Sequence, residues 1–304
     1  MTNAGFFDEG GQLWTSPDGR AWPAIYTSPQ RTAAGTPYML GPGVALIGRT
    51  MTCLDAAGPA LVDLDQAFDA YLDDPTDLGP GEQLAKFAGQ LCYLSFGPGA
   101  TRNAEAGRYF DNIRAQGHGS VLEHATYSFL WYGLSRSMTH EQVRHRLASY
   151  SQVSQRYVGG AHLRFVERPE YRDDEELHAR FVAKIDRDRA YYEESCDLLL
   201  RRQEAGYEAL AADKKTEARK RVRQCARESL PNCTEAPMVV TANARSWRHI
   251  LDMRASPAAE VEIRRLAYLT YLCLTQVDAL LWSDFASSVL PDGTSVLSTP
   301  TRRV

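Results

Sequence analysis

The chain of 304 residues has 34 Lys and Arg against 38 Asp and Glu, which gives a formal net charge of −4. Hydrophobic residues make up 44% and charged residues 24%, as expected for a globular protein with a sizeable core. The acidic balance disfavours a protein that coats DNA or RNA, because phosphate backbones attract basic surfaces.

The sequence contains no recognisable secretory signal and no apolar run long enough to span a membrane. Its six cysteines are scattered and include no C-x-x-C pair. We therefore expect a cytoplasmic protein whose thiols are free.

Along the chain, residues 1–42 are rich in Gly, Pro, Ser and Thr and show little periodicity. We expect an N-terminal extension there and a catalytic domain over 43–304. A first strand is expected to open at 44–47. Capping-box spacing predicts a helical turn at 120–123 and a helix that starts at Thr139 and continues to residue 148. Alternation predicts a strand at 125–132.

The other expected elements are helices at 81–94, 104–115, 173–208, 214–229, 243–253 and 259–285, and a short strand at 237–241. Strands and helices do not alternate as β-α-β units, and no G-x-G-x-x-G follows a strand. This order predicts an α+β fold, with a mixed or antiparallel sheet flanked by helices.

The first candidate constellation is Arg144-His145-Arg146, followed after seven residues by Ser154 and then by Arg156 and Tyr157. Guanidinium groups bind phosphates and carbonyl oxygens through two parallel hydrogen bonds. The segment is compatible with an anionic, heteroaromatic ligand, and the alternative is a solvated helix end.

Two further groups of cationic residues fall on predicted helices. Arg219, Arg223 and Arg227 have i, i+4, i+8 spacing and form one stripe, which is either a solvated face or a row of phosphate ligands. The acidity of the whole chain favours a small phosphorylated ligand over a polymer. The polar residues of the helix near 243–254 would converge on a ligand if this helix begins at a binding site. The alternative is a helix whose arginines face solvent and whose Trp247 lies in the core.

Two other patterns carry little weight. His140 and His145 resemble a zinc-protease motif, but five residues place them about 140° apart on a helix, so we expect no metal site. No His–Asp pair lies at a spacing from Cys233 that would indicate a thiol nucleophile. A buried structural thiol is the better interpretation.

Taken together, the segments resemble the flavin-dependent thymidylate synthase family, whose signature is Arg-His-Arg, seven residues and Ser. Further blocks that resemble the family are GHGSVLEH at 117–124, GLSRSMTHEQVRHR at 133–146, MVVTANARSWRHILDMRAS at 238–256 and VEIRRLA at 261–267. The resemblance runs from about Val44 to the C-terminus.

The resemblance implies reductive methylation of dUMP to dTMP, with FAD as cofactor and with NADPH and methylenetetrahydrofolate as co-substrates. It also implies a homotetramer with shared active sites and no catalytic cysteine. An alternative is the same chemistry on UMP, as in relatives from nucleoside-antibiotic pathways.

Residue roles follow from the same resemblance. Arg254 would stabilise negative charge on the pyrimidine, and Ser154 would position the base. The residues implied for the nucleotide are Glu141, Gln152, Ser154, Arg156, Tyr157, Arg227 and Arg254. Those implied for FAD are His118, Ser120, Arg144, His145, Arg146, Lys220, Arg223, Asn243, Arg245 and His249.

The chain departs from the family pattern at two positions. Ala258 stands where the family usually has a histidine that touches FAD, and Gln90 stands where Arg is common. Two other hypotheses are a nucleic-acid-binding module that uses the Arg219–Arg227 stripe, and a relative that binds ligands without turnover.

Overall fold

A central antiparallel sheet organises the chain, which this computed structural model describes over residues 11–17, 19–64 and 68–301. Among these residues the sheet has six strands in the order β1-β2-β5-β6-β9-β7, and every neighbouring pair is antiparallel. The strands are β1 (Gly11–Thr15), β2 (Ala21–Ile25), β5 (Gly43–Arg49), β6 (Thr126–Tyr132), β7 (Ser149–Gln152) and β9 (Met238–Asn243). The predicted α+β class is confirmed, and the strands expected at 44–47, 125–132 and 237–241 are β5, β6 and β9.

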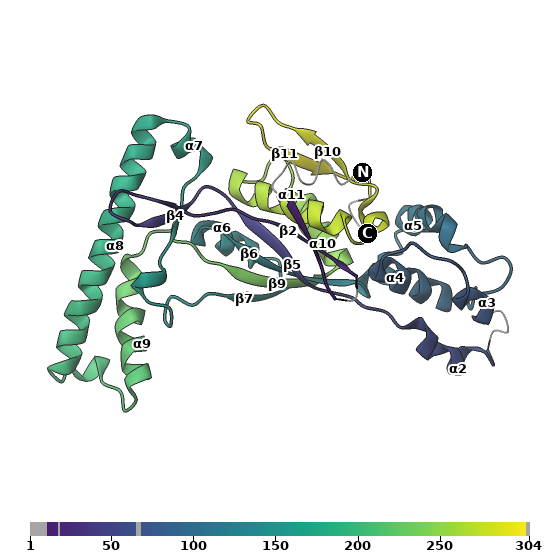
Figure 1. Ribbon diagram of the computed structural model, residues 1–304, viewed down its shortest axis with the longest axis horizontal. Coiled ribbons are helices and arrows are strands. Elements are labelled where there is room, and N and C mark those ends of the chain that lie inside the picture. Colours follow the sequence, from purple (N-terminus) through teal and green to yellow (C-terminus); the bar gives the residue numbers. More distant parts are fainter. Residues whose placement is uncertain (1–10, 18, 65–67, 302–304) are drawn as a thin grey trace.

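One face of the sheet forms the main core. Side chains alternate along β6, so that Tyr127, Phe129 and Trp131 point inward and are buried. Helices α10 (Ala244–Arg254) and α11 (Val261–Thr275) lie along this face (Figure 1). Trp247 of α10 meets the rings of Phe129 and Trp131 edge to face, with centroids 5.3 and 5.5 Å apart. These contacts fix α10 against the sheet.

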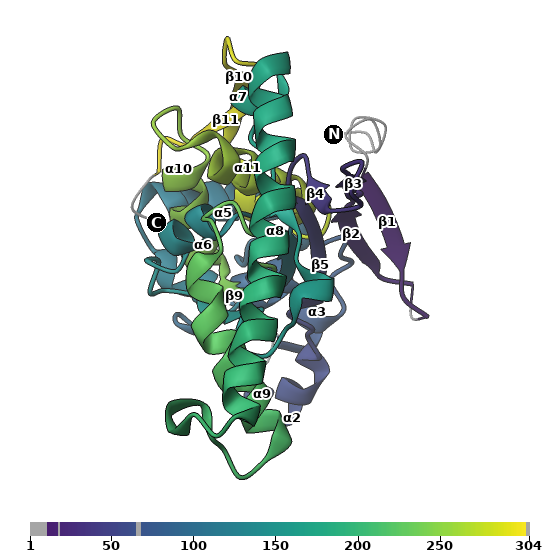
Figure 2. The same ribbon diagram turned by 90° about the vertical axis from the view of Figure 1, so that its left-hand side faces the viewer.

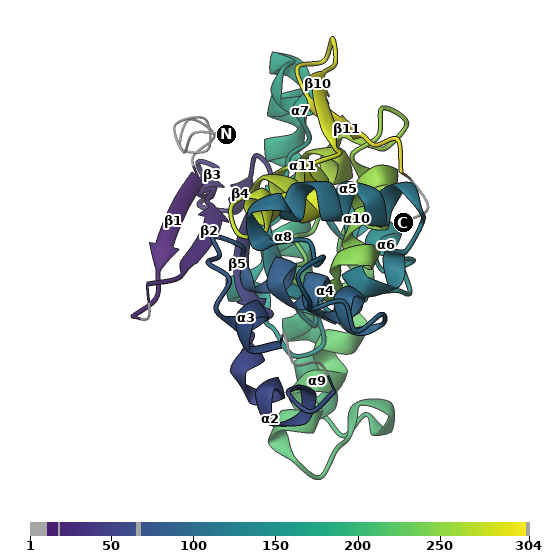
Figure 3. The same ribbon diagram turned by 90° about the vertical axis from the view of Figure 1, so that its right-hand side faces the viewer.

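A group of short helices lies at one end of the sheet (Figure 3). It comprises η1 (Leu54–Ala57), α2 (Gly58–Leu61), α3 (Phe68–Leu72), α4 (Pro80–Leu91), η2 (Asn103–Glu105), α5 (Ala106–Ala115) and η3 (Gly119–Glu123). Phe68, Tyr71 and Phe96 form a separate buried aromatic cluster there. The helices expected at 81–94 and 104–115 correspond to α4 and to η2 with α5.

At the other end, α8 (Glu175–Glu204) and α9 (Lys215–Ala226) form an arm that extends away from the sheet (Figures 1 and 2). Only Phe181, Ile185 and Tyr192 are buried along the 30 residues of α8. The remaining elements near the arm are η4 (Gly160–His162), α7 (Pro169–Arg172), η5 (Glu208–Leu210) and η6 (Arg227–Ser229). Most of α8 is therefore exposed or only partly buried.

Strands also form within residues 1–42, the range expected to be an extension. β1 and β2 lengthen the central sheet, and β2 pairs with β5. A three-stranded sheet joins β3 (Gln30–Arg31), β4 (Pro37–Met39) and β8 (Phe165–Val166). Tyr38 of β4 packs edge to face on Phe181 of α8. This part of the chain is thus tied to the arm and to the sheet.

The helix expected from Thr139 to residue 148 is wrong in position. Helix α6 (Arg136–Gln142) begins earlier because the Ser135 hydroxyl accepts a hydrogen bond from the Met138 amide, 3.1 Å away. It ends at Gln142, beyond which the chain turns into β7. The Tyr150 hydroxyl lies 2.9 Å from the Gln142 carbonyl and 3.0 Å from the His145 carbonyl, which stabilises this turn.

The single helix expected at 259–285 is also wrong in its extent. α11 ends at Thr275, and a turn leads to η7 (Ala279–Trp282) and the hairpin of β10 (Ala286–Val289) and β11 (Ser295–Ser298). The Asp278 carboxylate is buried at the turn, where it accepts hydrogen bonds from the Tyr127 hydroxyl at 2.7 Å and the Glu82 amide at 3.1 Å. These contacts favour the turn over a continued helix. In the described part of the chain, no helix is long and apolar enough to cross a membrane.

Candidate active site

Arg254, the last residue of α10, is held by two residues from the α6–β7 segment. Its Nε donates to His145 Nε2 at 2.7 Å, one terminal nitrogen donates to Glu141 Oε2 at 3.0 Å, and the other donates to the Glu141 carbonyl at 3.2 Å. The Arg254 side chain is only 18% exposed, whereas the Glu141 side chain is 45% exposed. The guanidinium is therefore fixed in direction and still reachable from solvent.

His145 is neutral in this arrangement. Burial, reinforced by the positive charge of Arg254 and by His249, lowers the pKa of His145 to about 4. An imidazole whose Nε2 accepts a hydrogen bond must carry no proton there, so the geometry and the pKa agree. The His249 ring meets the His145 ring edge to face, with centroids 5.7 Å apart. Four residues predicted for the site thus form one cluster.

A second cluster surrounds Tyr157, after β7. The Arg156 guanidinium lies 5.9 Å from the Tyr157 ring centroid and the Lys220 ammonium lies 5.2 Å from it. Arg223 donates a hydrogen bond to the Tyr157 carbonyl. The loop and α9 therefore bring two cations to the Tyr157 ring and a third to its backbone.

The second cluster also contains an unpartnered donor and a polar loop. Arg156 Nε is buried and has no hydrogen-bond partner among the described residues. The Ser154 hydroxyl accepts from the Arg156 amide at 3.3 Å, which shapes the loop. Gln152 lies nearby on β7 and donates to the Thr139 hydroxyl at 3.3 Å. Arg227 follows directly after α9 and is partly exposed.

A third cluster forms where α10 begins. Asn243 caps the helix by accepting from the Ser246 amide at 2.9 Å. Arg245 pairs with Glu123 of η3 at 2.6 Å. His118 and Ser120 lie on the same short segment and are exposed. Since η3 packs against α10, these predicted residues share one surface region.

Arg144 and Arg146 lie in the turn after α6 and are exposed, not on a helix as the sequence suggested. No side-chain hydrogen bond of either residue is found in the described ranges. Their side chains are therefore available to a ligand or another molecule, and the structure does not bring them to Arg254.

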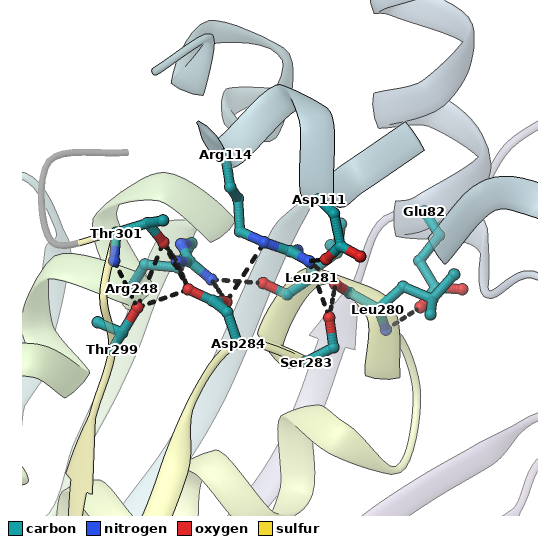
Figure 4. A network of polar contacts seen from close by, with 10 residues as sticks. All are labelled: Glu82, Asp111, Arg114, Arg248, Leu280, Leu281, Ser283, Asp284, Thr299 and Thr301. Atoms are coloured by element: carbon teal, nitrogen blue, oxygen red, sulfur yellow. Dashed lines mark hydrogen bonds and ion pairs between the residues drawn. The ribbon is translucent and has the colours of Figure 1, made fainter. Parts of the chain in front are cut away.

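Sequence reasoning missed Arg248, which is 2% exposed (Figure 4). Its terminal nitrogens lie 2.7 Å from both carboxylate oxygens of Asp284, and Thr301 joins the same network at 2.9 Å. Arg114 of α5 approaches Asp284 at 3.5 Å. This network ties α10 to the C-terminal segment and so orients the helix that carries Arg254.

A signal for Arg248 was present in the sequence. The residue shares the buried stripe of α10 with Ala244, Trp247 and Leu251, which have i, i+3, i+4, i+7 spacing. A charged residue on an apolar stripe becomes buried on folding and needs a buried partner, and this pattern indicates a structural ion pair for Arg248.

The two departures from the family pattern have different surroundings. Gln90 is buried on α4, where its side-chain oxygen accepts from the Lys86 ammonium at 2.9 Å. Ala258 is exposed in the loop between α10 and α11. No cluster of His, Cys, Asp or Glu suited to a metal ion is found among the described residues.

Comparisons with known proteins identify the family of the chain. The family model described as thymidylate synthase complementing protein, Thy1, matches residues 77–278. A flavin-dependent thymidylate synthase of Mycolicibacterium gilvum is 48% identical over 227 residues, covering 74% of the chain and 88% of that relative. The chain belongs to the flavin-dependent thymidylate synthase family.

Other members of the family agree. A flavin-dependent thymidylate synthase of Mycobacterium leprae is 43% identical over 225 residues, with the same coverage of 74% and 88%. One of Mycolicibacterium vanbaalenii is 46% identical over 237 residues, covering 77% of the chain and 92% of the relative. The family match contains all three clusters, while β1 to β5 precede it.

Proposed function

We propose that the chain methylates dUMP at carbon 5 to form dTMP, with FAD as its cofactor. Membership of the flavin-dependent thymidylate synthase family supports this reaction class. The observation that carries the proposal is the fixed guanidinium of Arg254, held by Glu141 and by neutral His145. Such a cation can stabilise negative charge that develops on a pyrimidine ring.

Arg254 suits this role because its direction is set before a ligand arrives. Preorganised donors stabilise developing charge without reorganisation at the moment of reaction. Glu141 is its only carboxylate partner among the described residues and is half exposed, so a nucleotide can replace or share that contact. Ser154 would position the base as a hydroxyl partner and not as a nucleophile.

The nucleotide would also be held by the loop after β7. The residues proposed to bind the nucleotide, besides Arg254, are Glu141, Gln152, Ser154, Arg156, Tyr157 and Arg227. The unpartnered, buried Nε of Arg156 supports a ligand here, because a buried donor without an acceptor is costly. A phosphate accepts such hydrogen bonds and matches the charge.

The donors present also fit a flavin dinucleotide. Lys220 and Arg223 would meet its pyrophosphate, and the other residues proposed to hold it are His118, Ser120, Arg144, His145, Arg146, Asn243, Arg245 and His249. The exposed cations Arg144 and Arg146 support binding of an anionic cofactor, as does the ammonium of Lys220. When bound, FAD would supply the redox chemistry of the reaction.

Further parts of the proposal are the co-substrates, the assembly and the compartment. We propose NADPH as reductant, methylenetetrahydrofolate as carbon donor, and a cytoplasmic homotetramer whose subunits share active sites. Within one chain, the predicted residues are spread over η3, the α6–β7 segment, the loop after β7, α9 and α10, and this spread supports a site that several subunits complete.

The test is a side-by-side assay with dUMP and UMP labelled with tritium at carbon 5. Purified protein with FAD, NADPH and methylenetetrahydrofolate should release tritium from dUMP faster than from UMP. Faster release from UMP would show that UMP is the preferred substrate of the same reaction. Absence of flavin absorbance after reconstitution, together with no release from either nucleotide, would reject the proposal.

A further inference from the structure

A pocket is lined in part by the loop after β7. It has a volume of about 580 Å³ and is lined by Arg31, Pro37, Gln155, Val158, Arg164 and Pro237, among others. Ligand pockets commonly enclose 300–1,000 Å³. One wall comes from β3 and β4, in the part of the chain that precedes the family match, and the opposite wall comes from the loop after β7.

This pocket is distinct from the proposed nucleotide site. Val153, Gln155 and Val158 line it, whereas Ser154 and Arg156, the residues proposed for dUMP, do not. None of the residues proposed above for dUMP or FAD lines the pocket. A ligand there would touch residues that have no role assigned above.

The polar groups of the pocket are donors without enough acceptors. Gln155 Nε2 is buried and has no hydrogen-bond partner among the described residues. Arg31 donates to the Gly35 carbonyl at 3.0 Å, and no ion pair of Arg31 is found in the described ranges. Both are therefore open to an acceptor that carries negative charge.

The one carboxylate in the pocket is already engaged. Glu235 is paired with Arg164, with Nη2 to Oε1 at 2.9 Å, and also accepts from the Gly133 amide at 2.6 Å. The lining thus contains two arginines and one glutamate, which leaves an excess of positive charge. An anionic ligand would balance this excess and would satisfy Gln155.

Apart from the exposed His162, the remaining lining is apolar. Pro29, Pro37 and Pro237 contribute rings whose backbone angles are fixed, and Val153 and Val158 contribute branched side chains. Such walls bury an apolar ring at a small cost in conformational entropy. The polar and apolar parts together describe a ligand with one charged end.

We propose that this pocket binds a small amphipathic anion, namely an apolar ring bearing one carboxylate or phosphate group. The anionic group lies between Arg31 and Gln155, and the ring lies against the prolines and valines. The site is independent of dUMP and FAD and depends on the N-terminal strands.

The test uses 1-anilinonaphthalene-8-sulfonate, a fluorescent amphipathic anion, with N-phenyl-1-naphthylamine as its uncharged analogue. Binding is measured on the full chain saturated with FAD and dUMP, so that the proposed active site is filled. One equivalent of the anion per chain should bind, and the uncharged analogue should bind more weakly. Competition by 1-naphthoate and by 1-naphthyl phosphate then shows which anionic group is preferred.

Two variants and a matched control locate the site. Arg31→Gln should weaken binding about threefold, as expected for one exposed charge. Gln155→Leu should weaken it about tenfold through loss of a hydrogen bond to a charged group. Arg108→Gln, on α5, removes a charge from an exposed pair with Glu105 and should change nothing.

Three results would overturn the proposal. The first is equal affinity of the wild type and both pocket variants, with thermal unfolding midpoints unchanged. The second is loss of binding once FAD and dUMP are saturating, which would place the probe in the active site. The third is failure of both naphthyl anions to compete.

Discussion

Replacing Arg254 by alanine tests the central element of the proposed site. The substitution removes a guanidinium that makes three hydrogen bonds, to His145 and twice to Glu141. It leaves His145 Nε2 buried without its donor, while the Glu141 carboxylate remains half exposed and can be hydrated. The effects on stability and on catalysis should therefore differ in size.

The stability cost comes from the His145 acceptor. An unsatisfied buried acceptor costs about 1–3 kcal/mol, and loss of the exposed contact to Glu141 adds little. The catalytic cost is larger. Removing one preorganised donor from developing charge lowers kcat by about 10²–10³-fold, equivalent to about 2.7–4 kcal/mol. Arg254→Lys keeps the charge but loses the planar fork, so an intermediate loss of kcat is expected.

The assay is tritium release from carbon 5 of dUMP, with kcat and KM measured separately and with FAD absorbance checked for each variant. Arg180→Ala is the matched control, because it removes an arginine from an exposed ion pair with Glu176 on α8. Near wild-type kcat in a folded Arg254→Ala protein that still binds FAD would refute the proposed role.

Three more predictions concern buried or partly buried side chains. Asp284→Asn should lower the free energy of unfolding by about 3–5 kcal/mol, because Arg248 and Arg114 lose their shared counter-charge; urea unfolding measures this, and a loss under 1 kcal/mol would contradict it. Burial raises the pKa of Asp278 from 3.8 to about 6. Between these two pH values the native state holds a proton that the unfolded state has lost. This carboxyl therefore makes the free energy of unfolding fall as the pH rises. The stability of Asp278→Asn relative to the wild type should therefore increase from pH 4.5 to pH 7 in the same experiment, and a constant difference would argue against this linkage. Burial also raises the pKa of Cys233 to about 11, so the group is a thiol at neutral pH, and Cys233→Ala should keep kcat within about twofold of the wild type; a loss like that expected for Arg254→Ala would instead reveal a catalytic thiol.

Local patterns predicted much of the fold. The alternation at 125–132 predicted β6, because successive side chains on a strand point to opposite faces and one face is buried. The charge-rich, periodic stretch at 173–208 predicted α8. Errors arose at boundaries. Thr139-His-Glu-Gln142 has the letters of a capping box, yet the cap is Ser135, whose own amide and hydroxyl are held by Glu262 from a distant helix.

The sequence by itself determined the family, since the Arg-His-Arg and Ser spacing and the flanking blocks are local and ordered. It also determined the α+β class, because hydrophobic periodicity records which faces are buried. Only the tertiary structure decided that Arg254 meets His145 and Glu141, more than a hundred residues away, and that Arg248 is buried on Asp284. The same holds for the pocket formed by Arg31 and Gln155. These contacts depend on how separate elements pack, and side-chain spacing along one element carries no information about its neighbours in space.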